Sequence, residues 1–158
     1  MNTTLYRYEK QGLIHRIHKG LYSLKKISDL DPHLIGIKAL HGQSYVSCES
    51  VLFAEGAINQ KPEAATLVGR VSRRFSAAGI MFRSRKLSDR FLYNEAGIEM
   101  KNGVRYASLE RAAADMLYFN PLKYFDSALS GLVDWGKVIN IAEAVGYKIK
   151  SEALNKNK

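Results

Sequence analysis

The segment that decides the fold class lies in the middle of the chain and reads ATLVGRVSRRFSAAGIMFRSRKL over residues 65–87. It is rich in β-branched and aromatic residues, which are typical of β-strands, and Gly79 interrupts it at a position suited to a turn. The segment therefore predicts neighbouring strands of one sheet. Because side chains alternate between the two faces of a strand, we expect Arg83 and Arg85 on the same face.

Two helices are predicted on the N-terminal side of these strands. The first follows Asp31, a suitable N-cap, with a proline at its first helical position, and it ends at Gly42. Next, SYVSCESVLFAEGAI at residues 44–58 predicts a brief strand and then a helix over residues 48–55. We expect Ser47 to cap that helix.

A hairpin followed by a helix is predicted on the C-terminal side. Asn102-Gly103 is a strong turn signal between two short runs that resemble strands. Ser108 is a suitable N-cap for the next segment, LERAAADMLYF, whose apolar residues form one stripe of a helix. Arg111 and Asp115 are four residues apart in it, so we expect them to form a structural pair on the helix surface.

Two further helices and a polar tail complete the predicted elements. One helix is expected near residues 122–132, and another is expected after Asp134, which can cap it, as far as Val145. The final segment, SEALNKNK at residues 151–158, is polar and is predicted to be flexible. The chain has no internal repeat, and its mixture of strands and helices predicts an α+β fold.

Composition limits the kinds of protein that this chain can be. Its 158 residues, 46% of them hydrophobic, suffice for one mid-sized domain or for a small module joined to a larger one. Cys48 is the only cysteine, so we expect neither an intramolecular disulfide nor a zinc site built from thiolates. There is no run of about 18 apolar residues and no secretory signal, so we expect a cytoplasmic protein that does not enter a membrane.

The net charge of +9 is concentrated in two segments. Residues 1–26 hold six lysines and arginines against one acidic residue, residues 70–90 hold seven against one, and the remainder is slightly acidic. Such clustering indicates surfaces that face a polyanion. The alternative interpretation is an uneven surface whose charges are simply solvated.

The first basic segment predicts a short helix and a hairpin. Thr3 or Thr4 can cap a helix over residues 5–10, and GLIHRIHKGLYSL at residues 12–24 predicts two strands around a Lys19-Gly20 turn. We expect His18 to pair with Leu21, and Ile17 to pair with Tyr22. Alternation then places one set of apolar side chains on the lower face: Leu13, Ile17, Tyr22 and Leu24. Arg16 and His18 are expected on the opposite, cationic face.

A helix followed by a basic hairpin is also the second half of a winged helix-turn-helix. In that arrangement the helix enters the major groove of DNA and the hairpin lies along the phosphates. The predicted DNA-binding residues are therefore Thr4, Arg7, Lys10, Arg16, His18 and Lys19. An ordinary helix and a solvated surface hairpin are the alternative.

Three segments together resemble a known family. They are LYRYEKQGLIHRIHKGLYSL, SYVSCESVLFAEGAI and GVRYASLERAAADMLYF, and their order and spacing are similar to those of the AbiEi antitoxins of type IV toxin–antitoxin systems. The matching features are the Gly-x-Tyr step of the hairpin, a segment like YVSCESVL, and a strand that leads into an A-S/T-x-E-R-A…D helix. The resemblance covers about residues 5–145, and each motif is short.

The resemblance implies a transcriptional regulator that represses its own toxin–antitoxin operon and counteracts a toxin of the nucleotidyltransferase type. It implies a partial winged helix over residues 1–28, because the family has two helices before the recognition helix and this sequence begins near Thr3. An antitoxin domain over residues 29–150 and a tail over residues 151–158 would follow. Its expected partners are operator DNA and, functionally, the toxin; no cofactor or catalytic residue is implied.

One interpretation of the second basic segment is that it extends the predicted nucleic-acid surface or contacts another acidic partner. Its basic residues are Arg70, Arg73, Arg74, Arg83, Arg85 and Lys86. A solvated sheet face is an equally good interpretation, because charges on an edge strand prevent unwanted strand pairing. A third possibility is an interaction module that keeps the C-terminal domain and does not bind an operator.

An enzyme is the least favoured hypothesis. Asp89 followed by Glu99-Met100-Lys101 fits loosely the pattern of metal-dependent nucleases, in which carboxylates hold Mg²⁺. A Glu-x-Lys sequence beside a hairpin turn is common, however. The histidines are not spaced to share a metal ion, so we expect neither a metal site nor catalysis.

Overall fold

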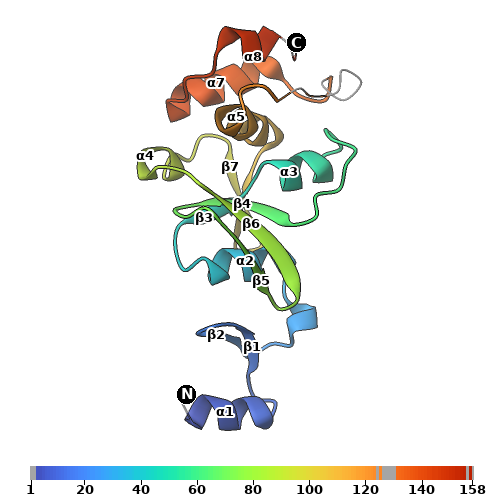
Figure 1. Ribbon diagram of the computed structural model, residues 1–158, viewed down its shortest axis with the longest axis vertical. Helices are drawn as coiled ribbons and strands as arrows, with labels where there is room; N and C mark the ends of the chain where they lie inside the picture. Colours follow the sequence, from blue (N-terminus) through green and yellow to red (C-terminus); the bar gives the residue numbers. More distant parts are fainter. Residues whose placement is uncertain (1–2, 124, 126–130, 156, 158) are drawn as a thin grey trace.

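The computed structural model describes residues 3–123, 125, 131–155 and 157, and its centre is a six-stranded sheet in the order β5-β6-β4-β3-β8-β7 (Figure 1). The segment at residues 65–87 forms three of these strands, as predicted: β4 (Ala65–Gly69), β5 (Arg73–Ala77) and β6 (Ile80–Lys86). β5 and β6 are antiparallel, whereas β4 and β6 are parallel. Ala78 and Gly79 between β5 and β6 both have positive φ, at 52° and 78°, which suits a tight hairpin turn.

The other three strands complete the sheet. They are β3 (Ser44–Val46), β7 (Ile98–Lys101) and β8 (Val104–Ala107). β3 pairs antiparallel with β4 and parallel with β8, and it lies completely buried in the middle of the sheet. The predicted turn at Asn102-Gly103 is confirmed, since it joins the antiparallel strands β7 and β8 with φ of 51° and 77°.

Helices cover both faces of the sheet, so the predicted α+β class is confirmed (Figure 1). One face is covered by α2 (Pro32–Ala39), and the other by α3 (Glu49–Ala54) and α5 (Leu109–Phe119). Beyond α5 lie α7 (Trp135–Val145) and α8 (Ser151–Asn155), and the short α4 (Asp89–Leu92) follows β6. None of the helices in the described part of the chain is long and apolar enough to cross a bilayer.

Three of the predicted helix caps are confirmed. Asp31 caps α2 through its Oδ1, which accepts a hydrogen bond from the His33 backbone N–H at 2.7 Å. Ser108 caps α5 and Asp134 caps α7, and each side-chain oxygen accepts at 3.1 Å from the backbone N–H three residues later. These caps depend only on residues that are close in the sequence.

The predicted cap of α3 is wrong. Cys48, with φ of 56°, precedes this helix, and no side chain caps it. The Ser47 hydroxyl instead donates to Asp115 Oδ2 at 2.7 Å, across the core. The Ser47 hydroxyl bonds to this carboxylate and not to the helix backbone, because both groups are completely buried and need partners.

The C-terminal segment was predicted to be a flexible tail over residues 151–158, and its described residues make specific contacts. It contains the helix α8, with Ala153 buried, and the Asn157 side chain is 2% exposed. Asn157 accepts from the Phe125 backbone N–H at 2.7 Å and donates to the Lys123 carbonyl at 3.1 Å. These contacts join Asn157 to residues 123 and 125. The helix predicted near residues 122–132 lies largely outside the described residues.

The N-terminal elements lie at one end of the molecule, and the helix α1 is the farthest of them from the sheet (Figure 1). They are the helix α1 (Thr3–Lys10), the hairpin strands β1 (His15–His18) and β2 (Leu21–Ser23), and a 3-10 turn η1 (Ile27–Asp29). A helix followed by a hairpin is thus present, as predicted.

The hairpin register differs in part from the prediction. His18 pairs with Leu21 as predicted, but Arg16 pairs with Tyr22, so Ile17 forms a bulge. Leu13 and Leu24, which were expected on the buried face, are 56% and 83% exposed. The bulge turns Ile17 and Leu21 together toward the core.

Candidate nucleic-acid interface

The hairpin is held against the sheet by its bulge. The Ala78 backbone N–H donates to the Ile17 carbonyl at 3.0 Å, and the Ile17 and Leu21 side chains pack against the core. His18, predicted on the cationic face, is half-buried with its ring centroid 6.1 Å from that of Phe75. The exposed cations of the hairpin are therefore Arg16 and Lys19.

Helix α1 carries the other predicted DNA-binding residues on one side. Thr4, Arg7 and Lys10 are exposed and line one open groove along the helix. The Lys10 ammonium lies 5.2 Å from the centroid of the Tyr6 ring. No residue of α1 is buried, and Arg7 and Lys10 form no ion pair with an acidic side chain in the described part of the chain.

The six basic residues of the second segment do not act as one surface. Arg70 forms two hydrogen bonds with Asp89, at 3.1 and 3.2 Å, and donates to the Tyr93 hydroxyl at 2.8 Å. Arg85 forms an ion pair with Glu49 and lies under α3 and α5, 5.5 Å from the centroid of the Phe119 ring. Both charges are thereby compensated within the fold.

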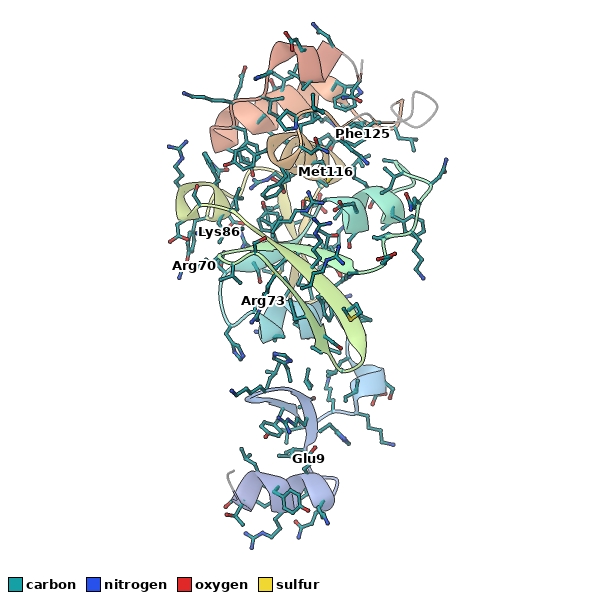
Figure 2. All side chains as sticks on the ribbon, viewed as in Figure 1. Glu9, Arg70, Arg73, Lys86, Met116 and Phe125 are labelled. Atoms are coloured by element: carbon teal, nitrogen blue, oxygen red, sulfur yellow. The ribbon has the colours of Figure 1, made fainter. Side chains whose placement is uncertain are left out.

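Arg73 is also used by the fold. Its Nη2 donates to the Ala39 carbonyl at 3.0 Å, at the C-terminal end of α2, where a positive charge is favourable. In Figure 2, Arg70, Arg73 and Lys86 lie on the same side of the molecule, near the end of β6. Lys86 is exposed, as are Arg74 and Arg83. Among the described residues, these last three have no acidic partner.

Arg111 and Asp115 form an ion pair at 3.0 Å, but the predicted position on the helix surface is wrong, because both side chains are completely buried. Asp115 accepts hydrogen bonds from the hydroxyls of Tyr45, Ser47 and Tyr147 at 3.0, 2.7 and 2.6 Å. Sequence reasoning missed these three partners. The run of alanines between the two charged residues was the available sign that this helix is buried all round.

The rest of the Arg111 side chain is fully used as well. Its guanidinium donates to the Tyr45 hydroxyl at 2.9 Å and to the carbonyls of Asn94, Ala96 and Phe91 at 3.2, 2.7 and 3.3 Å. This network joins α5 to β3, to the segment between α4 and β7, and to the segment after α7. A buried network in which the hydrogen-bonding groups have partners stabilises the fold, and this is the role that the network supports.

The protonation states of the network follow from burial. Burial raises the pKa of Tyr45 and of Tyr147, and the Asp115 charge raises both further, so these hydroxyls stay protonated and can donate. Burial by itself lowers the pKa of Arg111, but the Asp115 carboxylate outweighs it and raises that pKa. The guanidinium therefore remains charged at any physiological pH.

The residues of the nuclease hypothesis have other partners. Asp89 is paired with Arg70, and Glu99 lies 3.2 Å from Lys101 on the exposed hairpin of β7 and β8. Within the described ranges, no group of three or more histidine, cysteine or acidic side chains is placed to hold a metal ion. Asp89 and Glu99 thus each lie beside a cation of the protein itself.

His33 gives the fold a testable dependence on pH. Its Nδ1 lies 2.9 Å from the Tyr106 hydroxyl, and burial lowers its pKa, with Asp31 opposing the shift. The unfolded chain therefore binds this proton more readily, and the free energy of unfolding is expected to fall as the pH drops through about 6.5. Urea unfolding between about pH 7.5 and pH 5 measures this slope.

In His33→Gln the slope is expected to be smaller than in the wild type. His41→Gln is the matched control, because His41 is exposed at the other end of the same helix. An unchanged slope in the His33 variant would contradict the assignment.

The chain matches no protein-family model and no curated protein sequence. A function must therefore be argued from the geometry above and from the resemblance of the three sequence segments.

Proposed function

We propose that this protein is a DNA-binding transcriptional regulator of the antitoxin type, which represses its own operon and counteracts a nucleotidyltransferase toxin. The observation that carries the DNA-binding part is the arrangement at the N-terminal end. Exposed cations on α1, Arg7 and Lys10, are followed directly by exposed cations on the hairpin, Arg16 and Lys19. The antitoxin part is supported by the resemblance to the AbiEi family.

The hairpin has the support that a phosphate-binding wing requires. A contact with phosphate fixes the register of a protein on the duplex only if the contacting residue is held by a rigid element. The hydrogen bond between Ala78 and Ile17 and the packing of Leu21 attach this hairpin to the sheet. Arg16 and Lys19 can therefore hold the backbone while α1 lies in the major groove.

The proposal predicts specific, salt-dependent binding of the DNA upstream of the gene. Arg16→Gln and Lys19→Gln are each expected to weaken binding and to reduce the slope of log K against log salt concentration by about 0.9, the value for one phosphate contact on a duplex. An electrophoretic shift series at several salt concentrations measures both quantities.

Lys148→Gln is the matched control, because Lys148 is an exposed lysine after α7 without an acidic partner in the described part of the chain. It should leave the slope unchanged. Weak binding that is the same for every duplex would contradict an operator-binding role. A reading frame for a nucleotidyltransferase beside the gene would support the antitoxin role.

A second candidate is an interaction module that does not bind an operator. It is favoured by the large apolar side chains near α1: Tyr6, Tyr8 and Leu13 are 43%, 39% and 56% exposed. Exposed aromatic residues are enriched where proteins bind one another. Under this alternative, Tyr8→Ser would abolish the interaction, whereas Arg16→Gln would not alter it.

A further inference from the structure

Two arginines face each other across the outer strands of the sheet. Arg74 of β5 pairs directly with Arg83 of β6, and both are exposed. Residues opposite each other in an antiparallel pair have Cβ atoms about 5 Å apart, and like charges in this position destabilise the sheet. Among the described residues neither guanidinium has an acidic partner, so an external anion would relieve their repulsion.

The next arginine on the same face, Arg85, has its charge compensated within the fold, whereas Arg74 and Arg83 do not. Arg85 lies two residues beyond Arg83, under α3, and is paired with Glu49. On the other side of Arg83, Ser76 and Met81 form the next cross-strand pair, and both are exposed. The helical layer therefore leaves Arg74 and Arg83 accessible on an uncovered part of the sheet.

An open hollow of about 340 Å³ lies at the start of β6, between this strand, α3 and the segment that precedes β4. Its walls include Phe53 of α3 and Met81 of β6, which are 37% and 49% exposed, together with His33, Lys61 and one acidic residue, Glu63. Met81 and Arg83 lie on the same face of β6, about 7 Å apart along the strand. Met81, which lines the hollow, is thus the next residue after Arg83 on this face of the strand.

We propose that this surface, formed by Arg74, Arg83, Met81 and Phe53, binds a single strand of nucleic acid. A backbone phosphate would lie between the two guanidiniums, and the adjoining base would enter the hollow against Phe53 and Met81. Cations that follow the backbone, combined with an aromatic side chain that contacts a base, are typical of single-strand recognition. A nucleotide supplies a phosphate for the arginines and a flat base for the hollow in one unit, and this favours it over an acidic protein segment.

The site is separate from the proposed operator-binding residues, so the two proposals can fail independently. The test is the binding of a fluorescent oligothymidylate of about ten nucleotides, measured by anisotropy at several salt concentrations. Arg74→Gln and Arg83→Gln are each expected to weaken binding and to reduce the salt slope by about 0.7, the value for one phosphate of a single strand. Phe53→Ala is expected to weaken binding about five-fold with the slope unchanged.

Two controls separate this site from the rest of the basic surface. Lys148→Gln should bind like the wild type, and the double variant Arg16→Gln, Lys19→Gln should lose the operator shift but keep binding to the oligonucleotide. The thermal unfolding temperature of Arg83→Gln should equal or exceed that of the wild type, since one of two opposed charges is removed. If a variant stays folded and binds the oligonucleotide less tightly, the loss comes from the removed arginine contact and not from unfolding.

Three results would overturn the proposal. They are wild-type binding by both arginine variants, a loss of binding that appears only in the Arg16 and Lys19 double variant, and displacement of the oligonucleotide by an acidic peptide of the same charge at equal concentration. The third result would show that charge suffices and that the occupant is an acidic protein segment.

Discussion

Asp115→Ala is expected to lower the free energy of unfolding by about 3–5 kcal/mol, the effect of removing one partner from a buried ion pair. The substitution leaves the Arg111 guanidinium charged and completely buried. It also leaves the hydroxyls of Tyr45, Ser47 and Tyr147 without their acceptor. Unsatisfied buried donors add to the penalty of the isolated charge.

Chemical denaturation at neutral pH measures this loss. Glu143→Ala is the matched control, because Glu143 is an exposed carboxylate on α7, and its removal is expected to change stability by less than about 0.5 kcal/mol. The double variant Arg111→Met, Asp115→Leu is expected to be less destabilised than the sum of the two single variants, because no charge remains buried. A loss below about 1 kcal/mol in Asp115→Ala would contradict a structural anchor.

Gly36→Ala is expected to destabilise the protein by about 1–3 kcal/mol, although alanine is ordinarily the better helix former. A Cβ at this position of α2 would lie 2.4 Å from Phe82 Cε1 and 3.0 Å from Leu67 Cδ1. Phe82 is completely buried and stacks on Phe75, with ring centroids 5.3 Å apart, so it has little room to move. Overpacking therefore outweighs the gain in helix propensity.

The expected coupling can be tested with a double-mutant cycle. In a Phe82→Leu background, Gly36→Ala should cost less than in the wild type, because the shorter side chain removes the clash. Gly42→Ala is the control, since its nearest neighbour, the Leu40 carbonyl oxygen, would be 3.9 Å from the new Cβ. Stabilisation by Gly36→Ala in the wild type would contradict the close packing of α2 on the sheet.

Elements whose signals are local were predicted well from the sequence. The turn at Asn102-Gly103 and the caps at Asp31, Ser108 and Asp134 all formed where they were predicted. Each depends on backbone groups within a few residues, and no distant partner competes for the capping side chain. Local and tertiary preferences agree at these positions.

Predictions failed where a distant residue competed with the local signal. Ser47 is a good capping residue, yet its hydroxyl bonds to Asp115, 68 positions away. The C-terminal segment is polar, and nothing in it signals a partner, yet the Asn157 side chain bonds to Phe125, 32 positions away. Ile17 bulges out of an otherwise regular hairpin where its carbonyl accepts from Ala78. No periodicity in the sequence reports such partners.

The sequence by itself determined the α+β class, the turns and caps, and the concentration of positive charge in two segments. Only the tertiary structure decided which of those charges remain available to a partner. Arg70 is compensated by a residue 19 positions away and Arg85 by one 36 positions away, whereas Arg74 and Arg83 face each other and have no acidic partner among the described residues. The physical reason is that caps and turns act within one turn of backbone, whereas ion pairs and burial depend on which distant segments the sheet brings together.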